Sequence, residues 1–126
     1  MQLGQEDLDT ADLELIRSTG IRLGVSTHCH EELDRALLIK PDYIAIGPIW
    51  ETKLKKMAFG PQGVERITEW RELCGDIPVV AIGGITLERL PSCLKAGADS
   101  VSAVGDFIRH DDPEGQVRRW LAGAEA

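Results

Sequence analysis

Apolar residues follow two different spacings along this chain. Short runs rich in β-branched residues occur at residues 79–82 and 100–104, and each is followed directly by glycine. Runs without polar alternation are typical of parallel strands that are covered on both faces. Between the runs, apolar residues recur three and four positions apart, a spacing that places them on one face of a helix. The pattern therefore indicates an α/β protein.

The same pattern predicts the individual elements. It predicts strands at residues 21–25, 43–46, 78–82 and 100–104, and helices at residues 9–18, 31–39, 61–73, 86–96 and 113–121. Asp9 or Thr10 is expected to cap the first helix, and Gly20 to end it. Residues 47–60 are predicted to form a long connection rich in lysine. Strands and helices that alternate in this way form right-handed crossovers and a parallel sheet.

Length restricts the architecture further. With 126 residues, 43% of them apolar, the chain can bury one modest core, so we expect a single domain spanning residues 1–126. A complete (β/α)8 barrel has about twice as many residues. The two strands that end in glycine resemble the last two strands of such a barrel, where a phosphate group commonly binds. The sequence therefore predicts the C-terminal half of a TIM barrel, with about four to five β/α units.

Charge, hydropathy and cysteine content restrict the partners and the location expected for this protein. The net charge of −7 argues against a nucleic-acid partner, because nucleic-acid-binding surfaces are basic. No apolar run reaches the length of a membrane span, and residues 1–7 lack the basic and apolar regions of a secretory signal. The three cysteines are widely spaced, which is typical of reduced thiols in the cytoplasm. We therefore expect a cytoplasmic protein with no nucleic-acid or membrane partner.

Candidate chemistry lies where the predicted strands end, because the carboxyl ends of parallel strands meet at one edge of the sheet. These positions are Gln5-Glu6-Asp7, Ser26-Thr27-His28, Gly47-Pro48 with Lys53, Lys55 and Lys56, Gly83-Gly84 and Gly105. Each also has a purely structural interpretation. Asp7 suits a helix N-cap, Ser26 a turn, the lysines a solvated loop and the glycines ordinary strand ends. His28 and His30 lie two positions apart, and this spacing alone does not indicate a metal site.

Together, these motifs are far more specific than any one of them. In order and spacing they resemble the thiamine phosphate synthase family at Leu3-Gly4-Gln5-Glu6-Asp7, Gly24-Val25-Ser26-Thr27-His28, Gly47-Pro48-Ile49, Thr52 with Lys55, Pro61-Gln62-Gly63 and Ala81-Ile82-Gly83-Gly84-Ile85. The resemblance covers essentially all 126 residues, but only the later part of the family. The family's first three β/α units and most of its fourth strand have no counterpart in this sequence.

The resemblance implies a transferase of thiamine biosynthesis. A hydroxymethylpyrimidine diphosphate loses pyrophosphate, and the nitrogen of a thiazole phosphate bonds to the exposed methylene carbon to give thiamine phosphate. Mg²⁺ is the implied cofactor, because stabilising the departing diphosphate is the main catalytic demand. The implied partners are small phosphorylated substrates.

The resemblance also implies roles for single residues. Asp7 corresponds to a magnesium ligand, and the family's partner aspartate lies in the part without a counterpart here. Ser26 and Lys55 correspond to catalytic residues that contact the pyrimidine diphosphate. The residues that correspond to the thiazole phosphate site are Thr52, Lys53, Leu54, Gly84, Val104 and Gly105. The family more often has histidine, threonine and serine at the positions of Gln2, Leu54 and Gly105.

Three interpretations of the function stay open. The first is the synthase. The second is the related thiazole tautomerase, which shares the thiazole phosphate site and performs only proton transfer. The third is a catalytically inactive half-barrel fragment. Asp7, Ser26 and Lys55 belong to the pyrimidine and metal side of the site, so they favour the synthase.

A half-barrel also leaves surfaces that a closed barrel covers. Its outer strands keep unpaired backbone groups, and its inward side chains lose their cover. We expect those inward side chains to include Val25, Ile46, Val80 and Val101 or their neighbours. Exposed apolar surface of this kind usually finds a partner. The sequence therefore predicts self-association or pairing with the missing barrel half.

Overall fold

The computed structural model describes residues 1–50, 62–103, 105–108 and 110–125. Its centre is one parallel sheet of five strands in the order β1-β2-β3-β4-β5, so each strand pairs with the next one along the chain. The strands are β1 (Gln2–Leu3), β2 (Gly24–Thr27), β3 (Tyr43–Ile46), β4 (Val79–Ile82) and β5 (Ser100–Ser102).

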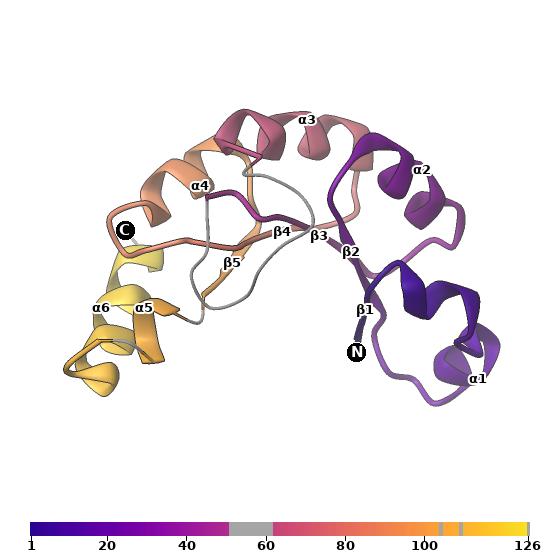
Figure 1. The fold of residues 1–126 in the computed structure, drawn as a ribbon, viewed down its shortest axis with the longest axis horizontal. Helices are drawn as coiled ribbons and strands as arrows, with labels where there is room; N and C mark the ends of the chain where they lie inside the picture. The colour runs from indigo at the N-terminus through magenta and orange to yellow at the C-terminus, as the bar shows by residue number, and fades with distance from the viewer. Residues whose placement is uncertain (51–61, 104, 109, 126) are drawn as a thin grey trace.

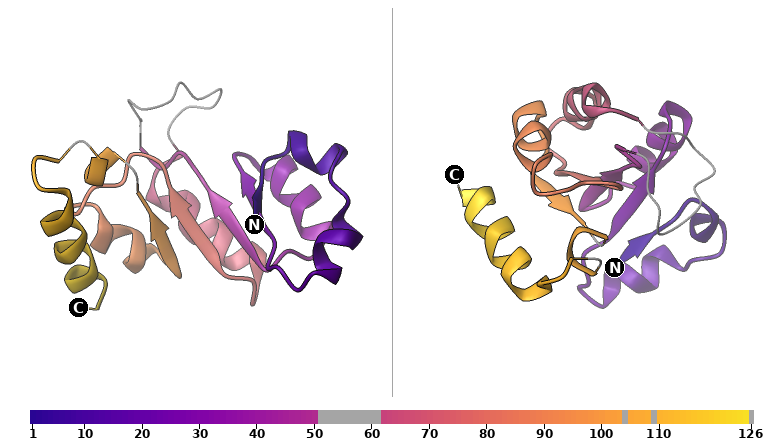
Figure 2. Two further views of the ribbon diagram at one scale, coloured as in Figure 1. Left: turned by 90° about the horizontal axis from the view of Figure 1, so that it is seen from below. Right: turned by 60° about the vertical axis from the view of Figure 1, so that its left-hand side comes forward.

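Helices follow the strands and lie along one side of the sheet. They are η1 (Glu6–Asp9), α1 (Leu13–Ser18), α2 (His30–Leu38), α3 (Val64–Cys74), α4 (Leu90–Ala96), α5 (Gly105–Ile108) and α6 (Pro113–Glu125). Figure 1 shows them as an arch around the outer side of the strands, and the two views of Figure 2 show the same one-sided arrangement. A parallel sheet covered by helices on its outer side is the repeat of a (β/α)8 barrel. The predicted fold class, a partial TIM barrel, is confirmed.

The core lies between the sheet and the helices. Val25, Ile44 and Val79 are register partners on three neighbouring strands, and each is fully buried. They share one buried cluster with helix side chains such as Leu33 of α2 and Trp70 of α3. The sheet therefore presents its apolar layer to the helices.

The hydrogen bonds of Thr27 show which face of the sheet its side chain occupies. Its hydroxyl donates a hydrogen bond to the Ala45 carbonyl at 2.8 Å and accepts one from the Trp70 indole at 2.8 Å. Because Trp70 belongs to α3, the Thr27 side chain points toward the helices. The register partners of Thr27 on the next strands, Ile46 and Ala81, lie on the same face.

Our expectation for the inward face is therefore wrong for three residues. Val25 belongs to the helix-facing core, and Ile46 and Val101 lie in the Thr27 layer. Only Val80 lies on the opposite, concave face, where its register partner on β5 is Ser100. The strands carry apolar residues on both faces, so their sequence does not distinguish the two faces.

A tyrosine crosses the concave face near its amino-terminal end. The Tyr43 ring covers Gly24 of the neighbouring strand, and a Cβ atom on Gly24 would lie 1.9 Å from Tyr43 Cζ. Only glycine at position 24 leaves room for this ring. The strand therefore begins at Gly24 with an aromatic side chain packed across it.

Several predicted boundaries differ from the structure. The first helix begins at Leu13, and its N-cap is Asp12, whose carboxylate accepts from the Leu15 amide at 3.0 Å; the predicted caps at Asp9 or Thr10 are wrong. The helix predicted from residue 86 begins at Leu90, since Pro91 is tolerated only in a first turn. The elements that sequence patterning did not predict are β1, η1 and α5.

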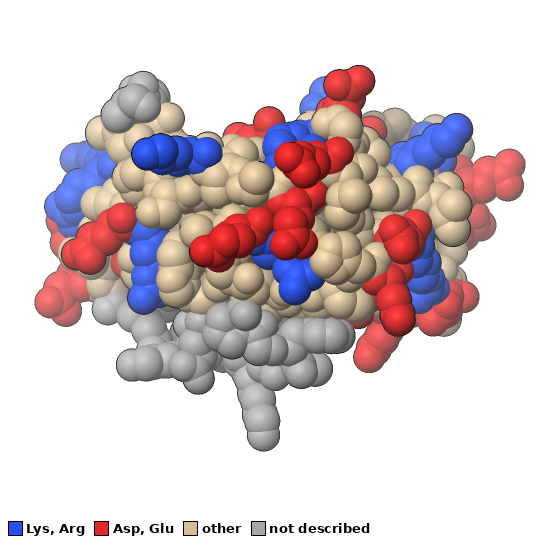
Figure 3. All heavy atoms as spheres, turned by 90° about the horizontal axis from the view of Figure 1, so that it is seen from above, with Lys and Arg blue, Asp and Glu red and all other residues tan. Residues whose placement is uncertain are grey.

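The outer surface of the helices carries charged side chains of both signs (Figure 3). Figure 3 shows acidic and basic side chains interspersed across it, with no large area of a single sign. Within the described ranges, none of the helices has the length and apolar character needed to span a membrane.

Candidate functional site at the carboxyl edge of the sheet

The candidate site residues gather at one edge of the sheet. Because all five strands run in parallel, the segments that follow them lie at a common edge. The structure places Asp7, Ser26, Gly84 and Gly105 at or directly after the carboxyl ends of β1, β2, β4 and β5. The predicted residues Thr52, Lys53, Leu54, Lys55 and Val104 lie outside the described residues.

The flanks of the lysine-rich connection are anchored at this edge. The Gln62 amide donates to the Pro48 carbonyl at 2.7 Å, and the Gly63 amide donates to the Ile49 carbonyl at 2.9 Å. The Gln62 side chain also donates to the His28 carbonyl at 2.6 Å. The connection therefore leaves and rejoins the fold beside the end of β2.

Asp7 has an exposed carboxylate at the end of β1. It lies in η1, and its Oδ2 accepts a hydrogen bond from the Gly4 amide at 3.0 Å. Asp12 caps the following helix, so the interpretation of Asp7 as that cap is wrong. A single carboxylate of this kind suits one position of a magnesium ion that keeps water and phosphate oxygens as its other ligands. Within the described part of the chain, no three His, Cys, Asp or Glu side chains come together to hold a metal ion.

Two glutamines hold Ser26 from the β1 side. The Gln2 side chain donates to Ser26 Oγ at 2.7 Å, and the Gln5 side chain donates to the Ser26 carbonyl at 2.8 Å. The hydroxyl bonds to a neighbouring strand, so the interpretation of Ser26 as a turn residue is wrong. An oxygen that accepts from Gln2 still has its own proton to donate to a ligand. Gln5 Oε1 is buried, and the described residues offer it no hydrogen-bond partner.

Tyr43 extends this network. Its hydroxyl donates to Gln2 Oε1 at 3.1 Å, so the chain of hydrogen bonds runs from Tyr43 through Gln2 to Ser26. Burial raises the pKa of Tyr43 above its ordinary value, which keeps the phenol protonated as the donor. Gln2 is the position where the family more often has histidine, and here its amide both accepts and donates.

The glycines after β3 and β4 allow two segments to approach closely. Gly83 has a φ of +95°, and a Cβ atom there would lie 2.6 Å from Pro48 Cα. A Cβ atom on Gly47 would lie 2.5 Å from the Ile82 carbonyl oxygen. The glycine at position 83 is therefore required by packing against Pro48, and the structure gives no reason to link it to a ligand.

Gly84 follows with its carbonyl already engaged. The Arg89 guanidinium donates to this oxygen at 2.6 Å and lies 4.8 Å from the centre of the Trp50 ring. This arrangement brings a cation and an aromatic ring to the end of β4. Neither Arg89 nor Trp50 belongs to one of the motifs shared with the family.

Gly105 begins α5, and the next residue is a carboxylate with three hydrogen bonds. Asp106 Oδ2 accepts from the Leu87 amide at 2.9 Å, from Gln116 Nε2 at 2.8 Å and from Trp120 Nε1 at 2.5 Å. Partial burial acts to raise the pKa of Asp106. The hydrogen bonds from Trp120, Gln116 and Leu87, with His110 nearby, outweigh that effect and hold the pKa below its usual value.

The histidines near the edge have separate partners. His28 Nδ1 lies 2.7 Å from Glu32, whereas His30 contacts Glu69 at 3.2 Å and lies 4.8 Å from the Trp70 ring centre. The His30 contacts join the start of α2 to α3.

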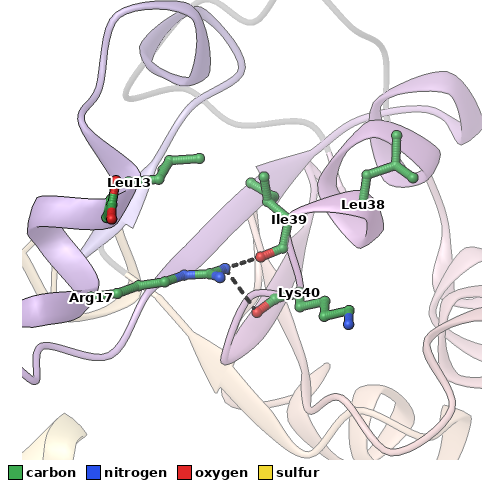
Figure 4. Close-up of a pocket in the computed structure, with 6 residues that line it drawn as sticks. Leu13, Arg17, Leu38, Ile39 and Lys40 are labelled. Carbon is green, nitrogen blue, oxygen red and sulfur yellow. Dashed lines mark hydrogen bonds between the residues drawn. The ribbon is translucent and has the colours of Figure 1, made fainter.

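A separate pocket of about 390 Å³ lies at the opposite edge of the sheet, between α1 and the end of α2. Arg17 reaches across it and donates to the carbonyls of Ile39 and Lys40 (Figure 4). These carbonyls follow the end of α2, where backbone acceptors have no partner within the helix. Arg17 therefore joins α1 to the end of α2, and none of the predicted site residues lines this pocket.

Sequence reasoning missed the supporting side chains of the site. The sequence places Tyr43 in a strand and indicates no role for Asp106 or Arg89. The one available signal was the position of Asp106 directly after Gly105. Nothing in the sequence indicates that Gln116 and Trp120, on another helix, would reach Asp106.

The chain matches known proteins along most of its length. Residues 1–107 match a family model described as thiamine monophosphate synthase. A thiamine-phosphate synthase from Rhizobium etli is 55% identical over 122 residues, which is 97% of this chain and 60% of the relative. One from an Enterobacter species is 53% identical over 112 residues, which is 89% of this chain and 53% of the relative.

A solved structure agrees with these matches. It is a thiamine phosphate pyrophosphorylase from Pyrococcus furiosus, with a TM-score of 0.77 at 28% identity. The alignment covers 98% of this chain and 58% of that protein. The chain therefore spans between half and two thirds of the length of the relatives it matches.

Proposed function

This chain belongs to the thiamine monophosphate synthase family, and we propose that it carries part of a thiamine phosphate synthase site. In the proposed reaction, hydroxymethylpyrimidine diphosphate and a thiazole phosphate give thiamine phosphate and pyrophosphate. One observation carries the proposal: Ser26 lies in β2, Asp7, Gly84 and Gly105 lie in the segments that follow β1, β4 and β5, and all four are at one edge of the sheet.

The pyrimidine diphosphate is proposed to bind between β1 and β2. The Ser26 hydroxyl accepts from Gln2, which leaves its own proton to donate, and a ring nitrogen of the substrate is the proposed acceptor. Lys55 is proposed to contact the departing diphosphate, where a cation gains most as charge develops. The anchoring of Pro48 and Gln62 near the end of β2 supports this assignment, because it brings both ends of the lysine-rich connection to the same edge.

Asp7 is proposed as one ligand of a magnesium ion. When bound, Mg²⁺ would neutralise charge on the diphosphate as its bond to the methylene carbon breaks. The exposed carboxylate suits this role. A second carboxylate would come from the part of the family that this chain does not match.

The thiazole phosphate is proposed to bind at the ends of β4 and β5. Gly84 and Gly105 lie there on neighbouring strands, and backbone amides at such positions are the usual donors to phosphate in this type of barrel. Thr52, Lys53, Leu54 and Val104 complete the proposed contacts. The tautomerase alternative uses only this side, and the orientation of Ser26 by Gln2 favours the synthase over it.

The open sheet is proposed to be covered by further barrel strands or by a second copy of this chain. Among the described strands, β1 and β5 each pair on one edge only, and Ser100 on the concave face is exposed. Unpaired strand edges of this kind favour association. Sedimentation at micromolar concentration is expected to show oligomers, and a compact monomer alone would contradict this proposal.

A cytoplasmic location is proposed on the state of the cysteines. Cys29, Cys74 and Cys93 are all free thiols. Burial raises the pKa of Cys74 and of Cys93 to about 11, so these thiols stay protonated and unreactive. Such thiols suit a reducing compartment.

Binding of the thiazole phosphate gives the direct test of the proposed site. In a ¹⁵N-labelled sample, titration with the thiazole phosphate is expected to shift the amide resonances of Gly84 and Gly105. Gly20, at the opposite edge, provides the internal control and should not move. A folded sample in which Gly84 and Gly105 do not respond would contradict the assignment.

A further inference from the structure

A single carboxylate joins three elements around the proposed phosphate site. Asp106 lies in α5, directly after Gly105, and accepts from the Leu87 amide in the segment between β4 and α4. The same oxygen accepts from Gln116 and Trp120 of α6. One atom thus holds the segment after β4, the segment after β5 and the last helix together.

The partners on α6 are themselves fixed. Gln116 and Trp120 are each only 6% exposed, and the Trp120 ring meets the Phe107 ring edge-on at 5.2 Å between centres. Gln116 Oε1 accepts from Arg119, which sets the orientation of its amide so that Nε2 faces Asp106. Packing and hydrogen bonds therefore hold the two donors of α6 in place against Asp106.

On charge alone, a carboxylate at this location should weaken anion binding. A negative charge one residue from a phosphate-binding amide repels the phosphate. Replacing Asp106 with a neutral side chain should then strengthen phosphate binding. If Asp106 instead shapes the site, the same replacement should weaken phosphate binding.

We propose that Asp106 is a positioning residue that sets the spacing between the Gly84 and Gly105 turns by tying both to α6. This inference rests on the proposed phosphate site at those two glycines. Gly84 and Leu87 belong to one short segment, so holding the Leu87 amide restricts where that segment sits relative to Gly105. Docking of α6 and binding of phosphate are consequently coupled.

Asp106→Asn tests the proposal, with inorganic phosphate as the probe. Asparagine keeps the shape and one acceptor oxygen but loses the charge that strengthens the three hydrogen bonds. The dissociation constant for phosphate is expected to rise about fivefold, despite the removal of a like charge. The resonance of the Trp120 indole and the hydrogen exchange of the Leu87 amide should change in the same variant.

Two control variants separate positioning from other effects. Asp111→Asn removes one exposed negative charge nearby and should leave both phosphate affinity and Leu87 exchange unchanged. Ile67→Val weakens the distant core in α3 and should lower the unfolding midpoint without changing phosphate affinity. If Asp106→Asn does not fold, Trp120→Phe serves in its place because it removes one of the three donors. It should change phosphate affinity and Leu87 exchange in the same direction as Asp106→Asn, but to a smaller extent.

The possible outcomes distinguish this proposal from the proposed function. Unchanged or tighter phosphate binding in Asp106→Asn would overturn the positioning role. If the native chain does not bind phosphate at Gly84 and Gly105, the proposed thiazole phosphate site fails. In that case faster Leu87 exchange in Asp106→Asn still supports the link between the two turns, and unchanged exchange overturns it.

Discussion

The hydrogen bonds of Thr27 should be a major contributor to stability. This residue precedes His28 at the end of β2 and follows Ser26, and it is 1% exposed. Its hydroxyl bridges the Ala45 carbonyl of β3 and the Trp70 indole of α3, each at 2.8 Å. Thr27→Val preserves the shape of the side chain but removes both hydrogen bonds.

The expected cost follows from burial. Trp70 is fully buried, so its indole N–H would lose its partner with no access to water. An orphaned buried donor costs roughly 1–3 kcal/mol, and a lost hydrogen bond to the Ala45 carbonyl adds about 1 kcal/mol. The extra methyl group offsets part of this through about 0.8 kcal/mol of hydrophobic burial. The free energy of unfolding should therefore fall by roughly 2 kcal/mol.

Urea unfolding followed by tryptophan fluorescence and circular dichroism measures this change. The midpoint should fall by roughly 1 M in Thr27→Val. Thr27→Ser keeps the hydroxyl and should lose less. Adding Trp70→Phe to Thr27→Val should cost less than the sum of the single changes, because the orphaned donor is then removed. A loss below about 0.5 kcal/mol, with additive single and double variants, would refute the reasoning.

Three further predictions concern charge and reactivity. In a protein extended by the family's upstream units, Lys55→Ala should slow the coupling reaction by raising its activation free energy by about 2–4 kcal/mol. Lys56→Ala should have little effect on the rate. Equal, small losses of rate in both variants would argue against the assignment of Lys55. The folded pKa of Asp106 lies below its unfolded value of 3.8, so its stabilising contribution is complete above that pH and is lost as the pH falls through the lower value. The stability difference between the native chain and Asp106→Asn should shrink below about pH 4, and a difference independent of pH would contradict this. At pH 8, iodoacetamide should label Cys74 and Cys93 only on unfolding, and rapid labelling of both in the folded chain would contradict their burial.

Sequence patterning predicts the strands best where a turn residue marks their limits. The strand at 43–46 agrees at both ends, because Pro41 stops the preceding helix and Gly47 follows the strand. The predicted start of the first helix is too early because Asp9, Thr10 and Asp12 are all suitable caps. Only tertiary structure selects among them.

The candidate site was likewise predictable only in part from the sequence. Asp7, Ser26 and the strand-ending glycines could be found from motifs, since these residues lie next to the strands that position them. The supporting contacts could not, because they join segments far apart in the sequence. Tyr43 reaches Gln2 across 41 positions and Trp70 reaches Thr27 across 43. No local pattern carries that information.

A coupling assay tests the central claim most directly. Hydroxymethylpyrimidine diphosphate, the thiazole phosphate and Mg²⁺ are supplied to this chain and to a version extended upstream by the β/α units that its relatives possess. Thiamine phosphate and pyrophosphate should form in equal amounts with the extended protein, and Ser26→Ala in that protein should slow their formation. The chain alone should show no turnover, because it carries only part of the proposed site. An extended, folded protein that binds both substrates and forms no thiamine phosphate would contradict the account.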